Sequence, residues 1–158
     1  MSVPAEYFRA GVGAVISNGS GLVMVFERAK IPGAWQFPQG GLEKGEDLLA
    51  AVYREVAEES GIAAGELELL AAHPDLLAYE LPASARSEKT GRGQVQYWFL
   101  FRYRGDEAAI NVQSGKEFSA WQWLPFAELL PKTAAFRKPV YSRLAEWVAG
   151  YFAKQVEK

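Results

Sequence analysis

The chain has 158 residues, of which 49% are hydrophobic, and it contains no cysteine. Its length suits a domain with a substantial core, and the lack of cysteine excludes thiol catalysis, disulfides and thiolate metal sites. The formal net charge of -2 argues against a protein that coats nucleic acid by bulk electrostatics. The sequence shows no signal-peptide core and no apolar run that could span a bilayer. We therefore expect a cytoplasmic protein whose residues 1–158 form one domain.

Two apolar segments open the chain. Residues 10–17 are small and β-branched, residues 22–28 are strongly apolar, and the Asn-Gly-Ser-Gly sequence between them is typical of a turn. This pattern predicts a β-hairpin.

A helix is predicted over residues 48–60. Asp47 can cap its N-terminus and Gly61 can end it. The predicted buried stripe consists of Leu48, Leu49, Val52 and Val56. This stripe leaves the glutamates of the helix mainly on another face.

Strands and short helices alternate through the rest of the chain. The apolar patterns predict strands at residues 67–72, 76–81, 94–103 and 120–124. Helices are predicted at residues 126–130 and 138–154, the second of them amphipathic. Strands interleaved with helices predict a layered α/β domain.

Three glutamates lie at helical spacing in the helix predicted over residues 48–60. Glu55 precedes Glu58 by three residues and Glu59 by four, so the three carboxylates crowd one side of the helix and repel one another. A hard divalent cation among these oxygens would relieve the repulsion. The alternative is an ordinary solvated acidic face, because glutamate is a good helix former.

The stretch around these glutamates resembles the signature of the Nudix hydrolases over residues 40–62. The matching positions are Gly40, Glu46, Arg54, Glu55, Glu58, Glu59, Gly61 and Ile62. The resemblance implies an α/β fold, the Nudix α/β/α sandwich with a mixed curved sheet between helices. It also implies hydrolysis of a pyrophosphate bond with a divalent metal ion, Mg²⁺ or alternatively Mn²⁺.

The same resemblance assigns catalytic and metal-binding residues by position. Arg54 is expected to hold the loop and the carboxylates, through Glu46, although a plain surface salt bridge is an alternative. Glu117, outside the signature, matches a glutamate that reaches the metal as ligand or as the base that activates water. On its own Glu117 would be read as a surface loop acid. The implied metal ligands are the Gly40 carbonyl, Glu55, Glu58, Glu59 and Glu117.

The segments flanking the signature resemble bacterial RNA pyrophosphohydrolases and dinucleoside polyphosphate hydrolases. The matching segments are residues 35–41, 79–82, 94–99, 117–123 and 136–141. Two segments depart from the usual pattern, Glu43-Lys44 before Gly45 and Ser114-Gly115-Lys116 before Glu117. These departures leave the implied catalytic residues in place and affect which leaving group would fit.

Substrate contacts are expected from residues of several types. Guanidinium and ammonium groups bind phosphate, which makes candidates of Arg9, Arg28, Arg137 and Lys138. Arg9 and Arg28 match basic positions of these hydrolases, whereas surface solvation is the default interpretation of Arg137 and Lys138. Phe136 matches an aromatic residue that stacks on a nucleobase, with core packing as the alternative. Further candidates for substrate contact are Gln39, Tyr79 and Gln94.

Three functions follow in order of preference. The first is removal of pyrophosphate from the 5′-triphosphate end of RNA, and the second is hydrolysis of dinucleoside polyphosphates or of (d)NTPs such as dGTP. The third is a nucleotide-sensing module without catalysis, which would require a damaged signature. The expected partner is a nucleotide or an RNA 5′ end, and nothing in the sequence indicates a membrane or a stable protein partner.

Overall fold

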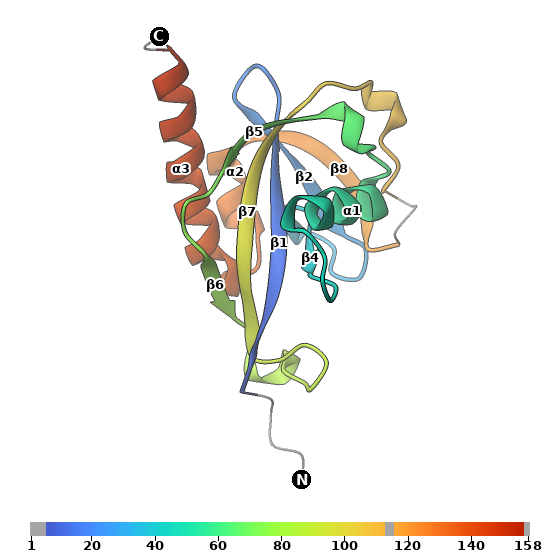
Figure 1. The fold of residues 1–158 in the computed structure, drawn as a ribbon, viewed down its shortest axis with the longest axis vertical. Helices are drawn as coiled ribbons and strands as arrows, with labels where there is room; N and C mark the ends of the chain where they lie inside the picture. Colours follow the sequence, from blue (N-terminus) through green and yellow to red (C-terminus); the bar gives the residue numbers. More distant parts are fainter. Residues whose placement is uncertain (1–5, 113–115, 157–158) are drawn as a thin grey trace.

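A mixed sheet of eight strands organises residues 6–112 and 116–156, the part of the chain that this computed structural model describes (Figure 1). The strands are β1 (Phe8–Ser17), β2 (Leu22–Arg28), β3 (Trp35–Gln36), β4 (Gln39–Gly41), β5 (Leu67–Ala72), β6 (Leu77–Glu80), β7 (Gly93–Tyr103) and β8 (Phe118–Pro125). The α-helices are α1 (Leu48–Ser60), α2 (Phe126–Leu129) and α3 (Lys138–Val156). Each helix and strand expected from the sequence is present, with ends that differ by at most two residues.

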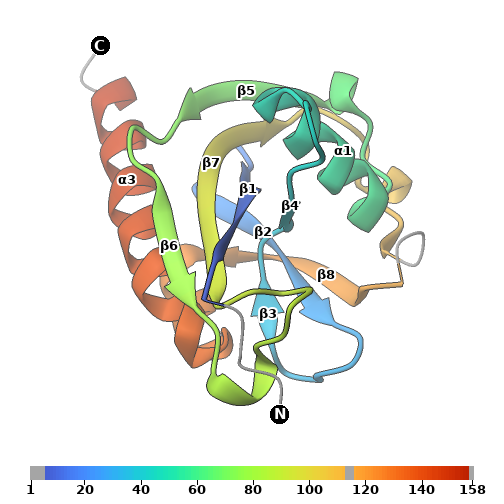
Figure 2. The ribbon, with the colours of Figure 1, turned by 60° about the horizontal axis from the view of Figure 1, so that its bottom comes forward.

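The two longest strands, β1 and β7, pair in parallel at the centre of the sheet. Their register runs from Phe8 opposite Gly93 to Ser17 opposite Arg102, whereas every other strand pair is antiparallel. Since parallel and antiparallel pairs coexist, the sheet is mixed, as expected. Figure 2 shows β4 beside β1, leading into the loop before α1.

The hairpin prediction is confirmed only at its turn. β1 and β2 pair at Ser17 and Val23, and the Asn18 N–H donates to the Leu22 carbonyl at 3.0 Å. Further from the turn, β4 takes the edge of β1 at residues 11–13, while β2 pairs with β8 along its whole length. A local pattern could predict the turn, but the two distant partners that separate these strands have no local signature.

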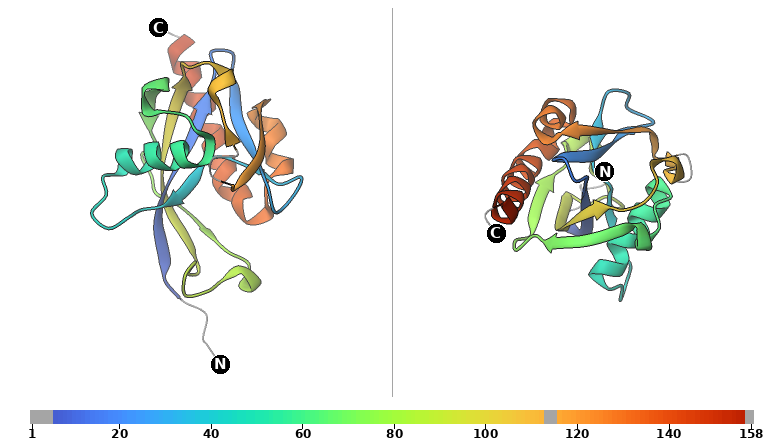
Figure 3. Two further views of the ribbon diagram at one scale, coloured as in Figure 1. Left: turned by 90° about the vertical axis from the view of Figure 1, so that its right-hand side faces the viewer. Right: turned by 90° about the horizontal axis from the view of Figure 1, so that it is seen from above.

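Helices cover both faces of the sheet, with α1 on one side and α3 on the other (Figures 1 and 3). β1 contributes side chains to the cores on both faces of the sheet, because successive side chains of a strand point to opposite faces. Val12 and Ile16 pack with α1, whereas Val15 packs with the residues under α3. The arrangement confirms the predicted α/β/α sandwich.

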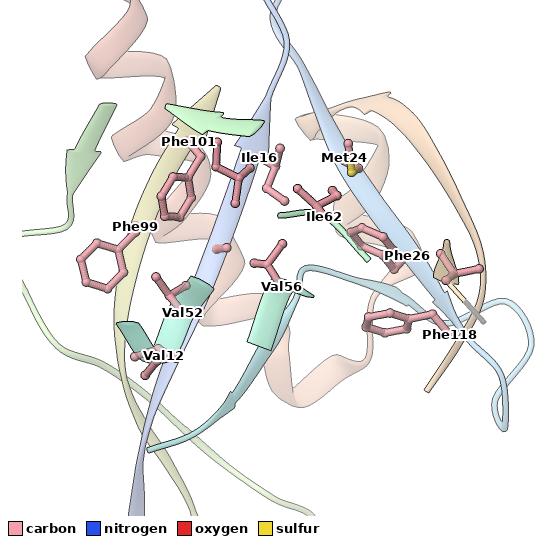
Figure 4. Packing of buried hydrophobic residues seen from close by; sticks show 14 residues of the cluster. Val12, Ile16, Met24, Phe26, Val52, Val56, Ile62, Phe99, Phe101 and Phe118 are labelled. Atoms are coloured by element: carbon pink, nitrogen blue, oxygen red, sulfur yellow. The ribbon is translucent and has the colours of Figure 1, made fainter. Parts of the chain in front are cut away.

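The core between the sheet and α1 explains the position of that helix. Figure 4 shows Val52 and Val56 among buried side chains of the sheet, including Phe101 and Phe26. Asp47 caps α1 by accepting a hydrogen bond from the Ala50 N–H at 3.1 Å. Gly61 ends the helix with a φ of 74°, a conformation that favours glycine.

The predicted stripe of α1 faces the core, although only half of it is fully buried. Val52 and Val56 are buried, and Leu48 and Leu49 are partly buried against the same core. Glu59, expected on another face, is buried with the helix's apolar residues. Its burial brings a carboxylate against the backbone of β4 at Gln39, and this places the site described below.

Helix α3 packs along the other face and reaches the segment before β4. The hydroxyl of Tyr141 accepts a hydrogen bond from the backbone N–H of Phe37 at 2.9 Å. Burial raises the pKa of Tyr141 to about 12, so this hydroxyl stays neutral. No helix within the described residues is both long enough and apolar enough to cross a membrane.

Candidate active site

Arg54 fixes the loop between β4 and α1. Its guanidinium donates to both carboxylate oxygens of Glu46, at 2.7 and 2.8 Å, and to the Gly41 carbonyl at 3.1 Å. A further donation reaches Glu55 at 2.8 Å, and one Glu58 oxygen lies 3.4 Å away. The predicted contact between Arg54 and Glu46 is confirmed.

The charges of this cluster stabilise one another. The hydrogen bond from Arg54 lowers the pKa of Glu46 to about 2, so Glu46 is ionised at neutral pH. The same bond is the largest cause of a raised pKa for Arg54. Arg54 is therefore a permanent cation that ties the loop, through Glu46 and Gly41, to Glu55 on α1.

Gly40 leaves room for the Glu55 carboxylate. A Cβ atom built at Gly40 would lie 2.0 Å from the Glu55 carboxyl carbon, which no real side chain permits. Burial raises the pKa of Glu55, the bond from Arg54 opposes this rise, and the nearby charge of Glu58 adds to it. The glycine is thus required because a carboxylate rests against its Cα atom.

Glu59 is a buried carboxylate with one unsatisfied oxygen. The side chain is 3% exposed, and within the described residues its Oε2 has no hydrogen-bond partner. Burial raises its pKa well above the ordinary value, and the charges of Glu117 and Glu55 raise it further. A buried carboxylate among two others is costly unless a proton or a cation compensates it.

These carboxylates suit a hard divalent cation. Carboxylate oxygens are the ligands that such ions prefer, and the unpartnered Glu59 oxygen provides one that nothing else uses. As they stand, no three acidic or histidine side chains of the described residues are gathered closely enough to form a metal cluster. Arg54 donates hydrogen bonds to Glu55 and Glu58, and about half of the Glu58 side chain is exposed to solvent. The complete ligand set stays a prediction.

A cavity of about 420 Å³ is lined by Glu117, the residue whose charge also acts on Glu59. It is also lined by six of the eight residues expected to contact substrate, and these are Arg9, Arg28, Tyr79, Gln94, Phe136 and Arg137. Gln39 lies behind the wall and donates to the Tyr79 hydroxyl at 3.2 Å. Lys138 is exposed at the start of α3 and does not line the cavity.

A cation and two aromatic rings stack at one end of this cavity. The rings of Tyr79 and Phe136 are 5.3 Å apart, and the Arg137 Cζ lies 4.6 Å from the Phe136 ring centre. Arg137 is only 5% exposed, and no carboxylate of the described residues forms an ion pair with it. An unpaired buried cation beside aromatic rings suits a ligand that is both planar and anionic.

A second cavity of about 470 Å³ shares Arg28 and Glu117 with the first. Its other lining residues are Lys30 and Lys116, and Lys116 has a φ of 61°, which is uncommon outside glycine. Ser114 and Gly115, the rest of the unusual segment before Glu117, lie outside the described residues. The two cavities thus adjoin at Arg28 and Glu117, and most of the charged residues that line them are basic.

The chain matches the NUDIX domain over residues 7–144. It belongs to the Nudix family. An RNA pyrophosphohydrolase of Rhodospirillum rubrum is 38% identical over 152 residues, covering 94% of this chain and 91% of that protein. One of Roseobacter denitrificans is 42% identical over 139 residues, covering 85% and 87%. The Escherichia coli dihydroneopterin triphosphate pyrophosphohydrolase shares the fold, with a TM-score of 0.71 and 21% identity over 89% of this chain and 98% of that one.

The family prediction made from residues 40–62 is therefore confirmed, and Nudix hydrolases generally use divalent metal ions. Five further lining residues of the cavity were not predicted to contact substrate: Ile31, Leu81, Pro82, Ala85 and Thr90. Lys30 and Lys116 were also missed, because an isolated lysine is usually a solvated surface residue. Only their position beside Glu117 distinguishes them.

Proposed function

We propose that this Nudix protein is a divalent-metal-dependent pyrophosphohydrolase that removes pyrophosphate from the 5′-triphosphate end of RNA. The observation that carries the proposal is the buried Glu59 oxygen without a partner, next to a cavity with basic and aromatic walls. Glu117 belongs to both parts, since its charge acts on Glu59 and its side chain lines the cavity. A substrate in the cavity would therefore present its phosphates to the carboxylates.

The proposed metal is Mg²⁺, with Mn²⁺ as the alternative. The residues that would hold it are Glu55, Glu58, Glu59, Glu117 and the carbonyl of Gly40. When bound, such an ion would neutralise phosphate oxygens and lower the pKa of an attacking water. Arg54 would keep Glu55 oriented, and Glu117 would serve as a further ligand or as the base that accepts the proton of the water.

The cavity provides groups for each part of a nucleotide. Arg9 and Arg28 are placed to bind phosphate oxygens, since guanidinium groups form paired hydrogen bonds with them. Phe136 would stack on the first base, an interaction of about 1–3 kcal/mol that tolerates any base. Arg137 would add a buried positive charge beside the stack, and Lys138 would meet the RNA further out.

The choice of RNA rests on similarity along most of the chain. The Rhodospirillum rubrum and Roseobacter denitrificans proteins that this chain matches are both named RNA pyrophosphohydrolase. The matched regions cover most of each chain and so extend well beyond residues 40–62. We propose the same substrate here, with residues 1–158 acting as one Nudix domain.

Turnover of defined substrates would test the proposal. The protein is incubated in Mg²⁺ with 5′-triphosphorylated RNA, diadenosine tetraphosphate and each dNTP, and kcat/KM and the released phosphate species are compared. We expect the highest kcat/KM on RNA, with pyrophosphate released. A preference for dGTP or diadenosine tetraphosphate would refute the RNA assignment, and no turnover of any substrate would favour the sensing module.

A matched pair of variants tests the role of the carboxylates. Glu59→Gln removes the charge from the buried site, and we expect a fall in kcat of at least about 100-fold, since a bound ion supplies several kcal/mol. Glu146→Gln makes the same change on the exposed surface of α3 and should leave kcat unchanged. Near-normal turnover by Glu59→Gln would show that this carboxylate does not serve the reaction.

A further inference from the structure

A chain of hydrogen-bonded side chains lies directly beneath the substrate cavity. β7 places Gln94, Gln96 and Trp98 at alternate positions, so the three side chains point to the same face of the sheet. Gln96 is completely buried and Trp98 is 1% exposed, whereas Gln94 reaches the cavity. Two buried side chains therefore support one that a ligand can touch.

Trp98 sets the direction of every hydrogen bond in this chain. An indole N–H can only donate, and it donates to the Gln96 Oε1 at 3.2 Å. The Nε2 of Gln96 must then face the opposite way, where it lies 2.9 Å from the side chains of both Gln39 and Gln94. Because an amide NH₂ only donates, both of these neighbours must turn their oxygens toward it.

The direction passes from Gln96 to the surface of the cavity. Gln39, with its oxygen facing inward, donates through Nε2 to the Tyr79 hydroxyl at 3.2 Å. The hydroxyl proton of Tyr79 is then free to point elsewhere. Gln94 accepts from Gln96, and its Nε2 has no hydrogen-bond partner among the described residues. Gln94 and Tyr79 thus present hydrogen-bond donors to the cavity.

The opposite direction would be costly. If the Gln96 amide were turned over, the Trp98 N–H would face another NH₂ group in a buried place. A buried donor left without a partner costs about 1–3 kcal/mol, and the oxygen now facing inward would also require both neighbouring amides to turn. The observed direction is the one that satisfies every buried group.

We propose that Gln96 and Trp98 are positioning residues that fix Gln94 and Tyr79 as donors, so that this wall of the cavity accepts only a hydrogen-bond acceptor oxygen. The oxygen comes from a phosphate or from a nucleobase carbonyl. Three of the other polar lining residues support this choice, because Arg9, Arg28 and Arg137 also donate only, whereas the carboxylate of Glu117 lines the same cavity as an acceptor. The inference deepens the proposed function and rests on its assignment of this cavity to the substrate.

Binding of a stable substrate analogue tests the inference. The probe is adenosine 5′-(α,β-methylene)triphosphate in Mg²⁺, titrated calorimetrically against the full chain, with inorganic tripolyphosphate as the second probe. Trp98→Phe keeps an aromatic ring but removes the donor, and we expect Kd for the nucleotide to rise about tenfold. A matching rise for tripolyphosphate assigns the oxygen to a phosphate, and a rise for the nucleotide alone assigns it to the nucleoside part.

Control variants separate the effect of hydrogen-bond direction from the effect of lost side-chain packing. Trp147→Phe makes the same change on α3, away from the cavity, and should leave Kd unchanged. In a Gln94→Ala/Tyr79→Phe background, both donors are already lost, so adding Trp98→Phe should change Kd by less than about twofold. If Trp98→Phe does not fold, Gln96→Met breaks the same chain with a side chain of similar length.

Three results would overturn the inference: a folded Trp98→Phe that binds as tightly as the natural protein, an equal loss in both backgrounds, or no binding of either probe. The RNA assay separates this inference from the proposed function. A protein that binds the analogue with the expected coupling but does not hydrolyse RNA refutes the function alone. A protein that hydrolyses RNA while Trp98→Phe leaves Kd unchanged refutes the inference alone.

Discussion

Replacing Gly40 with alanine should inactivate the protein while leaving it folded. The new Cβ would lie 2.0 Å from the Glu55 carboxyl carbon and 2.2 Å from its Oε2, whereas ordinary contacts begin near 3.4 Å. The carboxylate must therefore retreat by more than 1 Å, roughly the displacement that costs 100-fold in rate when a catalytic group is misplaced. We expect kcat/KM on triphosphorylated RNA to fall by about that factor.

Stability should change much less than activity. The group that must move is the end of a flexible side chain, and the φ of Gly40 lies outside the positive range that favours glycine. Gly65→Ala is the matched control, because a Cβ atom there meets nothing within 4 Å. Thermal unfolding is followed beside the kinetics for both variants. Full activity of Gly40→Ala, or a large fall in its melting temperature, would refute this reasoning.

Three further outcomes follow from the site. Phe136→Leu should raise KM about tenfold, because it removes the aromatic ring that stacks on the base. Phe136→Tyr keeps the ring and should leave KM nearly unchanged. Equal KM values for the two variants would argue against stacking. Chelation of divalent ions should abolish turnover, and added Mg²⁺ should restore it. Mg²⁺ should also raise the melting temperature, because it compensates the charge of the buried Glu59. Turnover that survives chelation would contradict the metal requirement. The folded-state pKa of Glu46 is lowered to about 2, so its pairing stabilises the fold fully above its unfolded pKa near 4.5 and is lost as pH falls toward 2. The stability gap between the natural protein and Glu46→Gln, measured by urea unfolding, should thus close over that range, whereas a gap independent of pH would rule out the ion pair as its cause.

Local patterns predicted the helices well and the strand partners poorly. Helix α1 occupies the predicted residues because Asp47 and Gly61 both carry local signals for its ends. The parallel pairing of β1 with β7 joins segments far apart in the chain, and no local pattern records it. The same limit explains the hairpin, which forms at its turn and then separates.

The main feature of the site that the sequence did not predict is the burial of a charged residue, Glu59. Hydrophobic periodicity assigns polar residues to the solvent side, so it placed Glu59 with the other glutamates. The structure nevertheless buries Glu59, whose carboxylate lies against the backbone of Gln39 in β4 and close to Glu55 and Glu117. The supporting roles of Gln96 and Trp98 were not predicted for a related reason. A buried glutamine on a strand gives no signal until its partners are known.

A single strand links the two halves of the site. One edge of β1 pairs with β4, where Gly11 lies opposite Gly41, and the other edge pairs with β7, where Gly11 lies opposite Gln96. Neighbouring strands are about 4.8 Å apart, so the backbones of β4, which carries Gly40, and of β7, which carries Gln94, are held about 10 Å from each other by backbone hydrogen bonds. A Cβ at Gly11 would lie 2.8 Å from the Gly40 carbonyl oxygen and 2.7 Å from Gln94 Oε1, so both groups approach β1 only because this residue has no side chain. The spacing between Gly40, whose carbonyl is a proposed metal ligand, and Gln94, which lines the cavity, is thus set by the sheet.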